Sequence, residues 1–522
     1  MTTIQTALTE LGFGGLAYGG EFGPVVGTID PHHPFFGAVG DIEYGIQGAF
    51  SGNVLTVESN FTPSQYYVGK RLWSALFVGG APRTITAISG RDITFDGAPI
   101  GATTNAWMIG TDDTAALRKA LRYAAFSPNS TFDSSGNLLT GSFVGNPLQF
   151  GTNPTSASFG RVVKLRAGHR YGVMNTAAEW DAYQANPATG SKAALTVPRR
   201  CGIVGDGHMQ SLIIALPAHK GNVVMTEGSE HPTFNANAYT DFVTLSDFGI
   251  EGTKGFIGSD ATRDGDNLRV RTAFEGYQYI DPHIRVSNVA SFNSRRDAFF
   301  FGGRGEMLLS ELRGHQARRY GLHMFGLVDS QVLNSKFGGS GRTGMRIDRS
   351  GACRIGDTKA FYNGQQGGTD VRDCANMVID ADQKLNGKVL VSGCDLQEAR
   401  GSNLVIATAG YNHFSGLRCQ DPGQENGLQG GALPTVRAGI HLLNASSSEN
   451  SFESVIVEPS VRGFQADNMK GTHALFIENG PSANVGTIVT QADAAWKTAK
   501  IGGTGTTNGA NTGLRVDGVP LT

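Results

Sequence analysis

Charge is scarce in this chain of 522 residues, of which only 17% are Asp, Glu, Lys or Arg, with a formal net charge of −2. No Lys- and Arg-rich run occurs, so the sequence shows no electrostatic footprint for duplex nucleic acid. No apolar run reaches the roughly 18 residues that would indicate a membrane span. The first residues, MTTIQTALTELGFGG, lack the basic start and apolar core of a signal peptide. We therefore expect a chain made in a cytoplasm that stays there or leaves by lysis, with no nucleic-acid partner and no membrane insertion.

Cysteine is also scarce. The five cysteines, Cys201, Cys353, Cys374, Cys394 and Cys419, are odd in number and widely spaced, and none lies in a CxxC pair. This pattern argues against a disulfide framework and against a zinc site. We expect reduced, buried thiols, and a protein that carries no metal and no other cofactor.

Glycine, in contrast, is abundant, at 73 residues. Because glycine adopts positive φ without steric cost, a fold with many tight turns is expected to be rich in it. Collagen is excluded, since the sequence has no Gly-X-Y period. Together with the length and the low charge, the glycine content favours an elongated repeat domain over a compact enzyme.

Composition divides the N-terminal part of the chain in two. Residues 1–50 are Gly-rich, apolar and nearly free of Lys and Arg, without lasting periodicity. They are interpreted as an extended arm that packs on another subunit or on a particle. In residues 51–109, short alternating runs such as NVLTVES and DITFDG are separated by Gly, Asn and Pro. Period-2 alternation with these breakers predicts a small antiparallel β domain.

A helix is predicted at residues 110–125, GTDDTAALRKALRYAA, where Leu117, Leu121 and Ala124 share one face. Its N-cap is expected from one of three residues, Thr111, Asp112 or Asp113. The adjacent carboxylates are therefore interpreted as helix caps rather than as catalytic groups. The helix is expected to cover the first coils of a solenoid, which occupy the rest of residues 110–239.

A repeat of 23 residues marks the remaining part, residues 240–522. The segments AFFF, GLHM and GMRI begin at residues 298, 321 and 344. The same spacing aligns three apolar columns, which are Val286–Leu309–Val332, Phe299–Leu322–Met345 and Phe301–Met324–Ile347. A period near 23 is typical of one coil of a β-solenoid with three short strands. A leucine-rich repeat has a similar length, but its LxxLxLxxN string is absent.

Three segments, GTDDTAALRKAL, VVKLRAGHRYGV and CGIVGDGHMQSLI, resemble the opening of pectate-lyase-like proteins. The resemblance implies an all-β fold, a right-handed parallel β-helix with a small N-terminal β domain and one capping helix. Arg166 departs from the family, which usually has Pro there. The resemblance implies little about chemistry, because the family contains lyases, hydrolases, epimerases and non-catalytic binders.

The β domain ahead of the helix resembles that of bacteriophage tailspikes. This resemblance implies a homotrimeric receptor-binding spike or fibre, made in the bacterial cytoplasm and displayed on the virion. Residues 1–50 would attach it to other virion proteins, and the β-helix would recognise host cell-surface polysaccharide, with depolymerisation left open. Two alternatives remain: a non-catalytic structural or adhesive head or tail spike, and a free polysaccharide lyase or glycoside hydrolase.

The 23-residue register also aligns three cations, Arg296, Arg319 and Arg342. Like charges about 5 Å apart on adjacent coils repel one another unless something negative lies against them. Acidic neighbours such as Asp297 are one solution, and a uronate or sulfated sugar held by the guanidinium groups is the other. Tyr320 belongs to the same predicted substrate-binding set.

His323 completes that set, since it follows Phe300 and precedes Arg346 in an outward column. The column and Tyr320 could form an aromatic and polar platform for a sugar, or ordinary surface. As catalytic carboxylates we propose Glu311 together with Asp297 or Asp348. Glycoside hydrolysis uses carboxyl separations of about 5–5.5 Å for retention, which one coil provides, or about 6.5–9.5 Å for inversion, which two coils provide.

Alternatives to this hydrolytic set remain open. Glu311 lies in a column between Asn288 and Asn334, where a structural role in a turn is also expected. A lyase would instead use a base beside a neutralised uronate. Its candidates are Arg319, Tyr320, His315 and His323.

Two further regions contain candidate functional residues. The insertion at 253–281 is expected to project from the solenoid, with Asp264, Asp266, Glu275 and Tyr277 as its candidate residues. His32 and His33 are the only close histidine pair and are expected in the N-terminal arm.

Overall fold

The computed structural model describes most of the chain from residue 28 onward. The described residues are 28–77, 81–125, 131–132, 138–140, 161–186, 191–226, 243–254, 264–271, 280–303, 305–366, 368–380, 388–407, 410–424, 432–444, 447–458, 471–478, 482–490, 501–503, 511 and 513–521. They form two compact units, residues 1–269 with 292–295, and residues 270–291 with 296–522.

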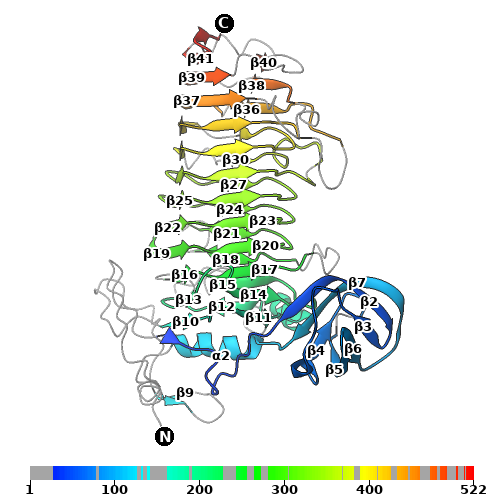
Figure 1. Cartoon of the computed structure of the whole chain (residues 1–522). Coiled ribbons are helices and arrows are strands. Elements are labelled where there is room, and N and C mark those ends of the chain that lie inside the picture. The colour runs from blue at the N-terminus through cyan, green and yellow to red at the C-terminus, as the bar shows by residue number, and fades with distance from the viewer. Residues whose placement is uncertain are drawn as a thin grey trace. The chain divides into compact units, whose positions relative to one another are not determined.

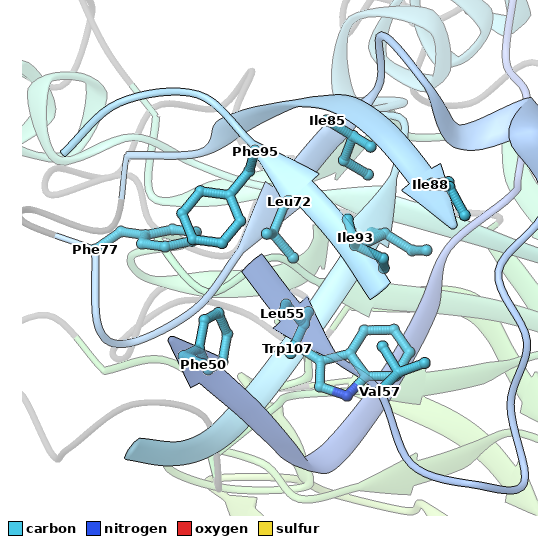
Figure 2. Packing of buried hydrophobic residues seen from close by; sticks show 11 residues of the cluster. Phe50, Leu55, Val57, Leu72, Phe77, Ile85, Ile88, Ile93, Phe95 and Trp107 are labelled. Atoms are coloured by element: carbon cyan, nitrogen blue, oxygen red, sulfur yellow. The ribbon is translucent and has the colours of Figure 1, made fainter. Parts of the chain in front are cut away.

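A closed barrel lies in the first unit and has the strand order β2-β3-β6-β5-β4-β7. Its strands are β2 (Glu43–Gly52), β3 (Val54–Thr56), β4 (Arg71–Trp73), β5 (Arg83–Ser89), β6 (Asp92–Phe95) and β7 (Ile100–Gly110), with the 3-10 helix η1 (Gln65–Tyr67) before β4. Alternate side chains point inward and close an aromatic-rich core around Phe50, Phe95 and Trp107 (Figure 2). The small β domain is confirmed, although the boundary predicted at residue 50 falls inside β2.

The first coils of a parallel β-helix occupy the rest of this unit. The strand β1 (Thr28–Ile29) pairs in parallel with β10 (Val162–Lys164), so residues 28–29 belong to the solenoid stack. The other strands are β11 (His169–Val173), β12 (Ala193–Val197), β13 (Gly202–Val204), β14 (Ser211–Ala215), β15 (Asn222–Thr226), β16 (Thr244–Ser246), β17 (Gly249–Glu251) and β18 (Leu268–Arg271). A separate hairpin joins β8 (Thr131–Phe132) and β9 (Leu138–Thr140). The boundary predicted at residue 239 lies outside the described residues.

Helix α2 (Thr114–Ala124) packs against β10 and β12, as expected for a cap. Leu117, Leu121 and Ala124 are buried, as predicted. Asp113 occupies the N-cap position, but its side chain does not cap the helix. Its carboxylate accepts hydrogen bonds from Val39 N at 2.7 Å and Gly40 N at 3.0 Å instead. The capping role is therefore wrong for the Asp113 side chain, because the backbone N–H groups of the loop at Val39 and Gly40 use it. Asp112 does meet the helix start, since its Oδ1 accepts a hydrogen bond from Thr114 N at 3.0 Å.

A second helix, α3 (Ala177–Ala185), was not predicted. Thr176 and Glu179 form a capping box at its start, with Glu179 N donating to Thr176 Oγ1 at 3.1 Å. Glu179 is in turn paired with Arg118 of α2. Both helices thus lie beside the first coils, where one helix was expected.

The second unit is a regular parallel stack, shown from green to red in Figure 1. Each regular coil gives two strands to one sheet and one strand to the other. The first sheet contains β19 (Ile280–Ser287), β20 (Ala290–Phe292), β22 (Gly305–Ser310), β23 (Arg313–His315), β25 (Gln331–Leu333), β26 (Lys336–Gly338), β28 (Arg354–Gly356), β29 (Lys359–Phe361), β31 (Leu390–Ser392), β32 (Asp395–Gln397), β34 (His413–Ser415), β35 (Arg418–Gln420), β37 (Ser451–Glu458), β39 (Val485–Thr490), β41 (Leu514–Val516) and the antiparallel β42 (Val519–Pro520). The other contains β21 (Phe299–Gly302), β24 (Leu322–Phe325), β27 (Met345–Asp348), β30 (Met377–Asp380), β33 (Leu404–Ile406), β36 (Ala438–Leu442), β38 (His473–Ile477) and β40 (Ile501–Gly503).

The 23-residue register is confirmed. The observed strand partners are Val286–Leu309–Val332, Phe299–Leu322–Met345 and Phe301–Met324–Ile347. All nine side chains are buried inside the solenoid. Because strands in a sheet are about 4.8 Å apart, each column is a continuous apolar ladder along the axis.

All five cysteines are buried and none forms a disulfide, as predicted. Burial raises the pKa of Cys353 and Cys394 to about 12, so their thiols are protonated and poorly reactive. In the described part of the chain, no helix is long and apolar enough to cross a membrane.

Candidate functional site

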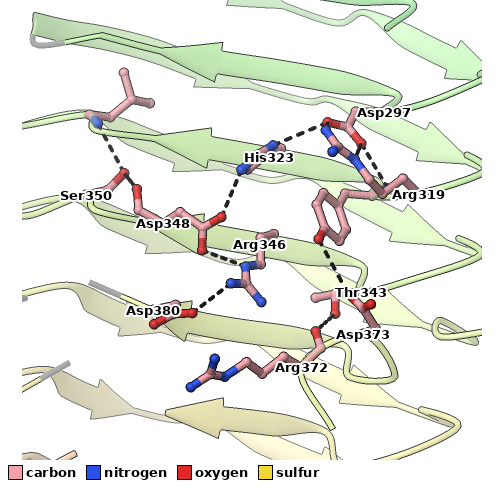
Figure 3. A network of polar contacts seen from close by, with 12 residues as sticks. Asp297, Arg319, His323, Thr343, Arg346, Asp348, Ser350, Arg372, Asp373 and Asp380 are labelled. Atoms are coloured by element: carbon pink, nitrogen blue, oxygen red, sulfur yellow. Dashed lines mark hydrogen bonds and ion pairs between the residues drawn. The ribbon is translucent and has the colours of Figure 1, made fainter. Parts of the chain in front are cut away.

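Five of the predicted site residues meet on the outer side of β24 and β27 (Figure 3). Asp297 is fully buried in the turn before β21 and contacts Arg319, Tyr320 and His323. Arg319 binds it with two hydrogen bonds, from Nε to Oδ1 at 2.7 Å and from Nη2 to Oδ2 at 2.5 Å. Tyr320 N also donates to Oδ1, at 3.2 Å. The carboxylate of Asp297 is therefore held by a bidentate guanidinium group and a backbone amide.

His323 joins Asp297 to Asp348. Its Nδ1 lies 3.3 Å from Asp297 Oδ2 and its Nε2 lies 3.0 Å from Asp348 Oδ2. Arg346 lies on the same outward column. Its Nε donates to Asp348 Oδ1 at 2.5 Å and its Nη2 donates to Asp380 Oδ2 at 2.7 Å. The result is a chain of alternating charges over four adjacent coils.

The pKa values in this chain of charges favour the ionised forms. Burial alone would raise the pKa of Asp297, but Arg319 and His323 outweigh it and hold this pKa well below its usual range. Burial likewise opposes ionisation of Asp348, yet His323 and Arg346 lower its pKa. Burial would lower the pKa of His323, but the two carboxylates raise it above 6.5. The imidazolium form, with both N–H groups donating, fits this environment.

Tyr320 and Arg342 meet a residue that was not predicted, Asp373. Tyr320 Oη lies 3.5 Å from Asp373 Oδ1, and Arg342 Nη1 lies 3.1 Å from Asp373 Oδ2. The Tyr320 ring also lies beside Arg319 at 4.8 Å and beside the His323 ring at 5.2 Å. The aromatic and polar side chains of the predicted platform therefore lie together, although Tyr320 is only 8% exposed to solvent.

The arginine column has the predicted register, since Arg319 N donates to Arg296 O and Arg342 N donates to Arg319 O. Acidic neighbours of the same unit pair with Arg319 and Arg342, namely Asp297 beside Arg319 and Asp373 beside Arg342. The structure thus favours internal neutralisation over an anionic ligand at these two arginines. The substrate-binding roles of the column stay a prediction.

The structure does not bring Glu311 to this group. Glu311 is exposed in the turn between β22 and β23, and its φ of 55° matches the values of 50° for Asn288 and Asn334 in the same column. This geometry agrees with the structural alternative. Asp297 and Asp348 lie two coils apart, with the His323 imidazole and two hydrogen bonds between them. This exceeds the roughly 5–5.5 Å of a retaining pair, and an inverting pair stays a prediction. Since both also have a lowered pKa, neither is a good proton donor near pH 7.

The other predicted regions have structural roles where they are described. Buried Asp266 pairs with Arg269 at 2.8 Å, and Asp264 makes a bridge with Gly221. Glu275 and Tyr277 lie outside the described residues. His32 packs on His169 of β11, with ring centroids 4.2 Å apart. In the described part of the chain, no group of three or more His, Cys, Asp and Glu side chains is arranged to hold a metal ion.

The outer face of β23, β26 and β29 carries cations with fewer acidic partners than the arginines beside β24 and β27. Arg313, Lys336 and Lys359 are strand partners on β23, β26 and β29, and all three point outward. Two positions further along the same strands, His315, Gly338 and Phe361 are partners. The sequence contains the signal for this column, because its three cations are spaced by 23 residues (313, 336, 359).

The same face continues into three carboxylates, Asp395 on β32, Glu398 in the turn after β32 and Asp421 in the turn after β35. Glu398 N donates to Gln420 O at 3.0 Å and Asp421 N donates to Glu458 O at 2.9 Å, so these residues follow one another coil by coil. Burial and the nearby charges of Glu398 and Glu458 raise the pKa of Asp421 to about 7. Burial also raises the pKa of Glu398, against the opposing charge of Lys359.

Asp421 is only 3% exposed, and its Oδ1 has no hydrogen-bond partner among the described residues. A buried carboxyl with a pKa near 7 is of the type that glycoside hydrolases use as a general acid. Glu398 and Asp421 lie on adjacent coils, whose backbones are about 4.8 Å apart. The two residues are therefore a candidate carboxyl pair for acid–base chemistry.

The scan against family models finds no match, and no curated protein matches the chain. The chain is similar in structure to the A-module of the mannuronan C-5 epimerase AlgE4 of Azotobacter vinelandii, with 13% identity over 78% of this chain and 93% of that module, at a TM-score of 0.43. It is also similar to the full-length tailspike protein 2 of the Escherichia coli O157:H7 bacteriophage CAB120, with 12% identity over 90% of this chain and 53% of the tailspike, at a TM-score of 0.43.

A third similar structure is a tailspike variant of the E. coli bacteriophage HK620 in complex with a pentasaccharide. It shares 10% identity over 74% of this chain and 63% of that chain, at a TM-score of 0.43. The chain spans about half the length of tailspike protein 2, at 53%. At these identities the likenesses concern the parallel β-helix fold alone.

Proposed function

We propose that the chain is a receptor-binding spike of a bacteriophage-like particle that recognises host cell-surface polysaccharide. The observation that carries this proposal is the outer face of β23, β26, β29, β32 and β35, where cations, an aromatic ring, amides and carboxyls follow one another along a rigid stack. Such a linear series of polar groups suits a long, repetitive ligand. The resemblance of residues 110–215 to pectate-lyase-like proteins supports the same interpretation.

The particle-bound part of the proposal rests on the sequence. The resemblance of the N-terminal region to that of tailspikes favours attachment to other virion proteins through this region, display on the particle surface and assembly as a homotrimer. Sedimentation of the purified chain tests the assembly, and a mass of three chains is expected. A monomer that still binds polysaccharide would contradict the trimer while leaving recognition in place.

Recognition is tested with purified surface polysaccharides from a panel of bacteria, both capsules and lipopolysaccharides, by biolayer interferometry. We expect micromolar or tighter binding to one or a few of them. Binding to none of the surface polysaccharides of a host on which the particle grows would contradict the proposal.

A second candidate function, hydrolysis of the bound polysaccharide, is favoured by Glu398 and Asp421. The raised pKa of Asp421 suits a general acid, and ionised Glu398 on the adjacent coil would act as nucleophile or base. Mass spectrometry of the products separates the alternatives. A product with added water indicates a hydrolase, an unsaturated product a lyase, and an unshortened polymer a non-catalytic spike.

A further inference from the structure

The outer column of Arg313, Lys336 and Lys359 places three cations on adjacent coils of the second unit. Arg313 and Lys336 are exposed, and Lys359 is partly exposed. Strand spacing puts their backbones about 4.8 Å apart, so the charges repel one another. Solvent screens part of this repulsion, but a bound anion would remove it.

This column is not neutralised as the arginines of the other face are. Among the described residues, no carboxylate forms an ion pair with Arg313 or Lys336, and only Lys359 has one, with Asp395 at 3.6 Å. The positive charge of the column affects His315. Burial lowers the pKa of His315, and the charges of Lys336 and Arg313 lower it further. By contrast, Arg319 and Arg346 on the other face each contact buried or partly buried carboxylates.

The lysines are held in place by an aromatic ring. The Phe361 ring centroid lies 5.0 Å from Lys336 Nζ and 5.7 Å from Lys359 Nζ. The ring folds back over Gly338, where an added Cβ would lie only 2.4 Å from Phe361 Cζ. A side chain at residue 338 would therefore displace the ring, and Gly338 is what allows this arrangement.

The column leads directly to the carboxyl pair. Lys359 Nζ donates to Gln397 Oε1 at 2.9 Å, and Gln397 precedes Glu398. The next partner of Gln397 along the stack is Gln420, which precedes Asp421. The column of Lys359 itself continues with Asp395 and then Arg418. A polymer lying along the axis would thus pass three cations and then two coils that carry both amides and carboxyls.

We propose that this face binds an acidic polysaccharide, one that carries carboxylate or sulfate groups at regular intervals, with its anions on Arg313, Lys336 and Lys359. The inference rests on the proposed function and specifies its ligand class. Lysine ammonium groups bind such anions as point charges, and Arg313 can bind a carboxylate or sulfate with two hydrogen bonds. A polysaccharide is favoured over a nucleic acid because the cations form one narrow column in a chain with a net charge of −2.

The test compares the wild-type chain with the triple variant R313Q/K336Q/K359Q on an array of bacterial surface polysaccharides, half acidic and half neutral. A single-stranded oligonucleotide forms a further arm. The matched control is R91Q/R122Q/K388Q, which removes three exposed cations that lie elsewhere. Far-ultraviolet circular dichroism and the unfolding midpoint establish that each variant is folded.

We expect binding to acidic polysaccharides that weakens with added NaCl. Each removed charge should weaken it about threefold, and the triple variant roughly thirtyfold, with the control unchanged. Carboxylated and sulfated members of the array identify which anion is preferred. Equal binding by the triple variant and the wild type, or tighter binding of the oligonucleotide than of any polysaccharide, would overturn the inference. Binding to neutral polysaccharides alone would overturn it while leaving the proposed function standing, whereas binding to none contradicts the proposed function.

Discussion

Glu398 and Asp421 occupy the same turn position on adjacent coils, with left-handed φ values of 55° and 51° and backbone N–H groups that each donate to the following coil. If this pair hydrolyses the bound polysaccharide, Asp421 must be protonated and Glu398 ionised. Because the pKa of Asp421 is raised to about 7, the cleavage rate should fall as the pH rises above about 7. On the acid side it should fall as Glu398 becomes protonated.

The variants D421N and E398Q should each reduce cleavage by about 10²–10⁴-fold while binding is retained. The measurement is the rate of reducing-end release against pH. The variant D357N, at an exposed turn position, serves as the control. Full cleavage by D421N would remove the catalytic role from this residue.

The same carboxyl makes a prediction about stability. Its pKa is raised from 3.8 to about 7 in the folded chain, so its favourable contribution is present below pH 3.8 and is lost as the pH rises through about 7. D421N should therefore be more stable than the wild type at pH 8, by about 4 kcal/mol at most, and this difference should shrink toward pH 4. Urea unfolding of both proteins across this range measures it. A constant difference at all pH values would show that the carboxyl is not buried as described.

Asp297 pairs with both Arg319 and His323, so the variant D297N should be strongly destabilised. The change leaves Arg319 and His323 without their shared carboxylate, at a cost of about 3–5 kcal/mol in the free energy of unfolding. D373N is the control, since Asp373 pairs with a more exposed arginine and its loss should cost under about 1 kcal/mol.

D297N should also lower the pKa of His323, which Asp297 helps to raise. The stabilisation that His323 provides is fully present below pH 6.5 and is lost as the pH rises through its raised folded pKa. In D297N this loss should occur at lower pH. Nuclear magnetic resonance titration of the His323 ring follows it, and an unchanged midpoint would contradict the coupling.

Two leucines test which face of the stack is the core. Leu309 is 0% exposed in the ladder Val286–Leu309–Val332, whereas Leu390 points outward on β31 and is 47% exposed. L309A should cost about 2–5 kcal/mol because it leaves a cavity, and L390A should change stability by about 0.5 kcal/mol or less. Urea midpoints of the two variants compare them. Similar losses of stability in both variants would contradict this strand register.

The sequence predicted the fold where its pattern is regular. Residues 286–347 keep a constant coil length, so one spacing identified the apolar ladders and also brought Asp297, Arg319 and His323 together. The constant spacing is lost after Lys359 because the next coil is longer: Lys359 and Asp395 are strand partners although 36 residues separate positions 359 and 395. The spacing of 23 returns at Val391–Phe414 and Leu396–Cys419, and so between Glu398 and Asp421, but the longer coil separates these residues from the regular ladders.

Other features depended on three-dimensional surroundings. The sequence could not tell that Asp373 and Asp380, which lie outside the regular register, would pair with Arg342 and Arg346. It also could not tell that Asp113 would bind the loop at Val39 and Gly40 instead of its own helix. Helix α3 did carry a local signal, since Thr176 and Glu179 have the spacing of a capping box.

Hydroxyl-radical footprinting of the chain with and without a bound surface polysaccharide tests recognition on the outer face of β23, β26, β29, β32 and β35. We expect protection of side chains on this face, with Lys336, Phe361 and Lys359 foremost, and little change at Tyr320 and His323. Protection confined to the β24 and β27 side, or to the N-terminal barrel, would contradict it.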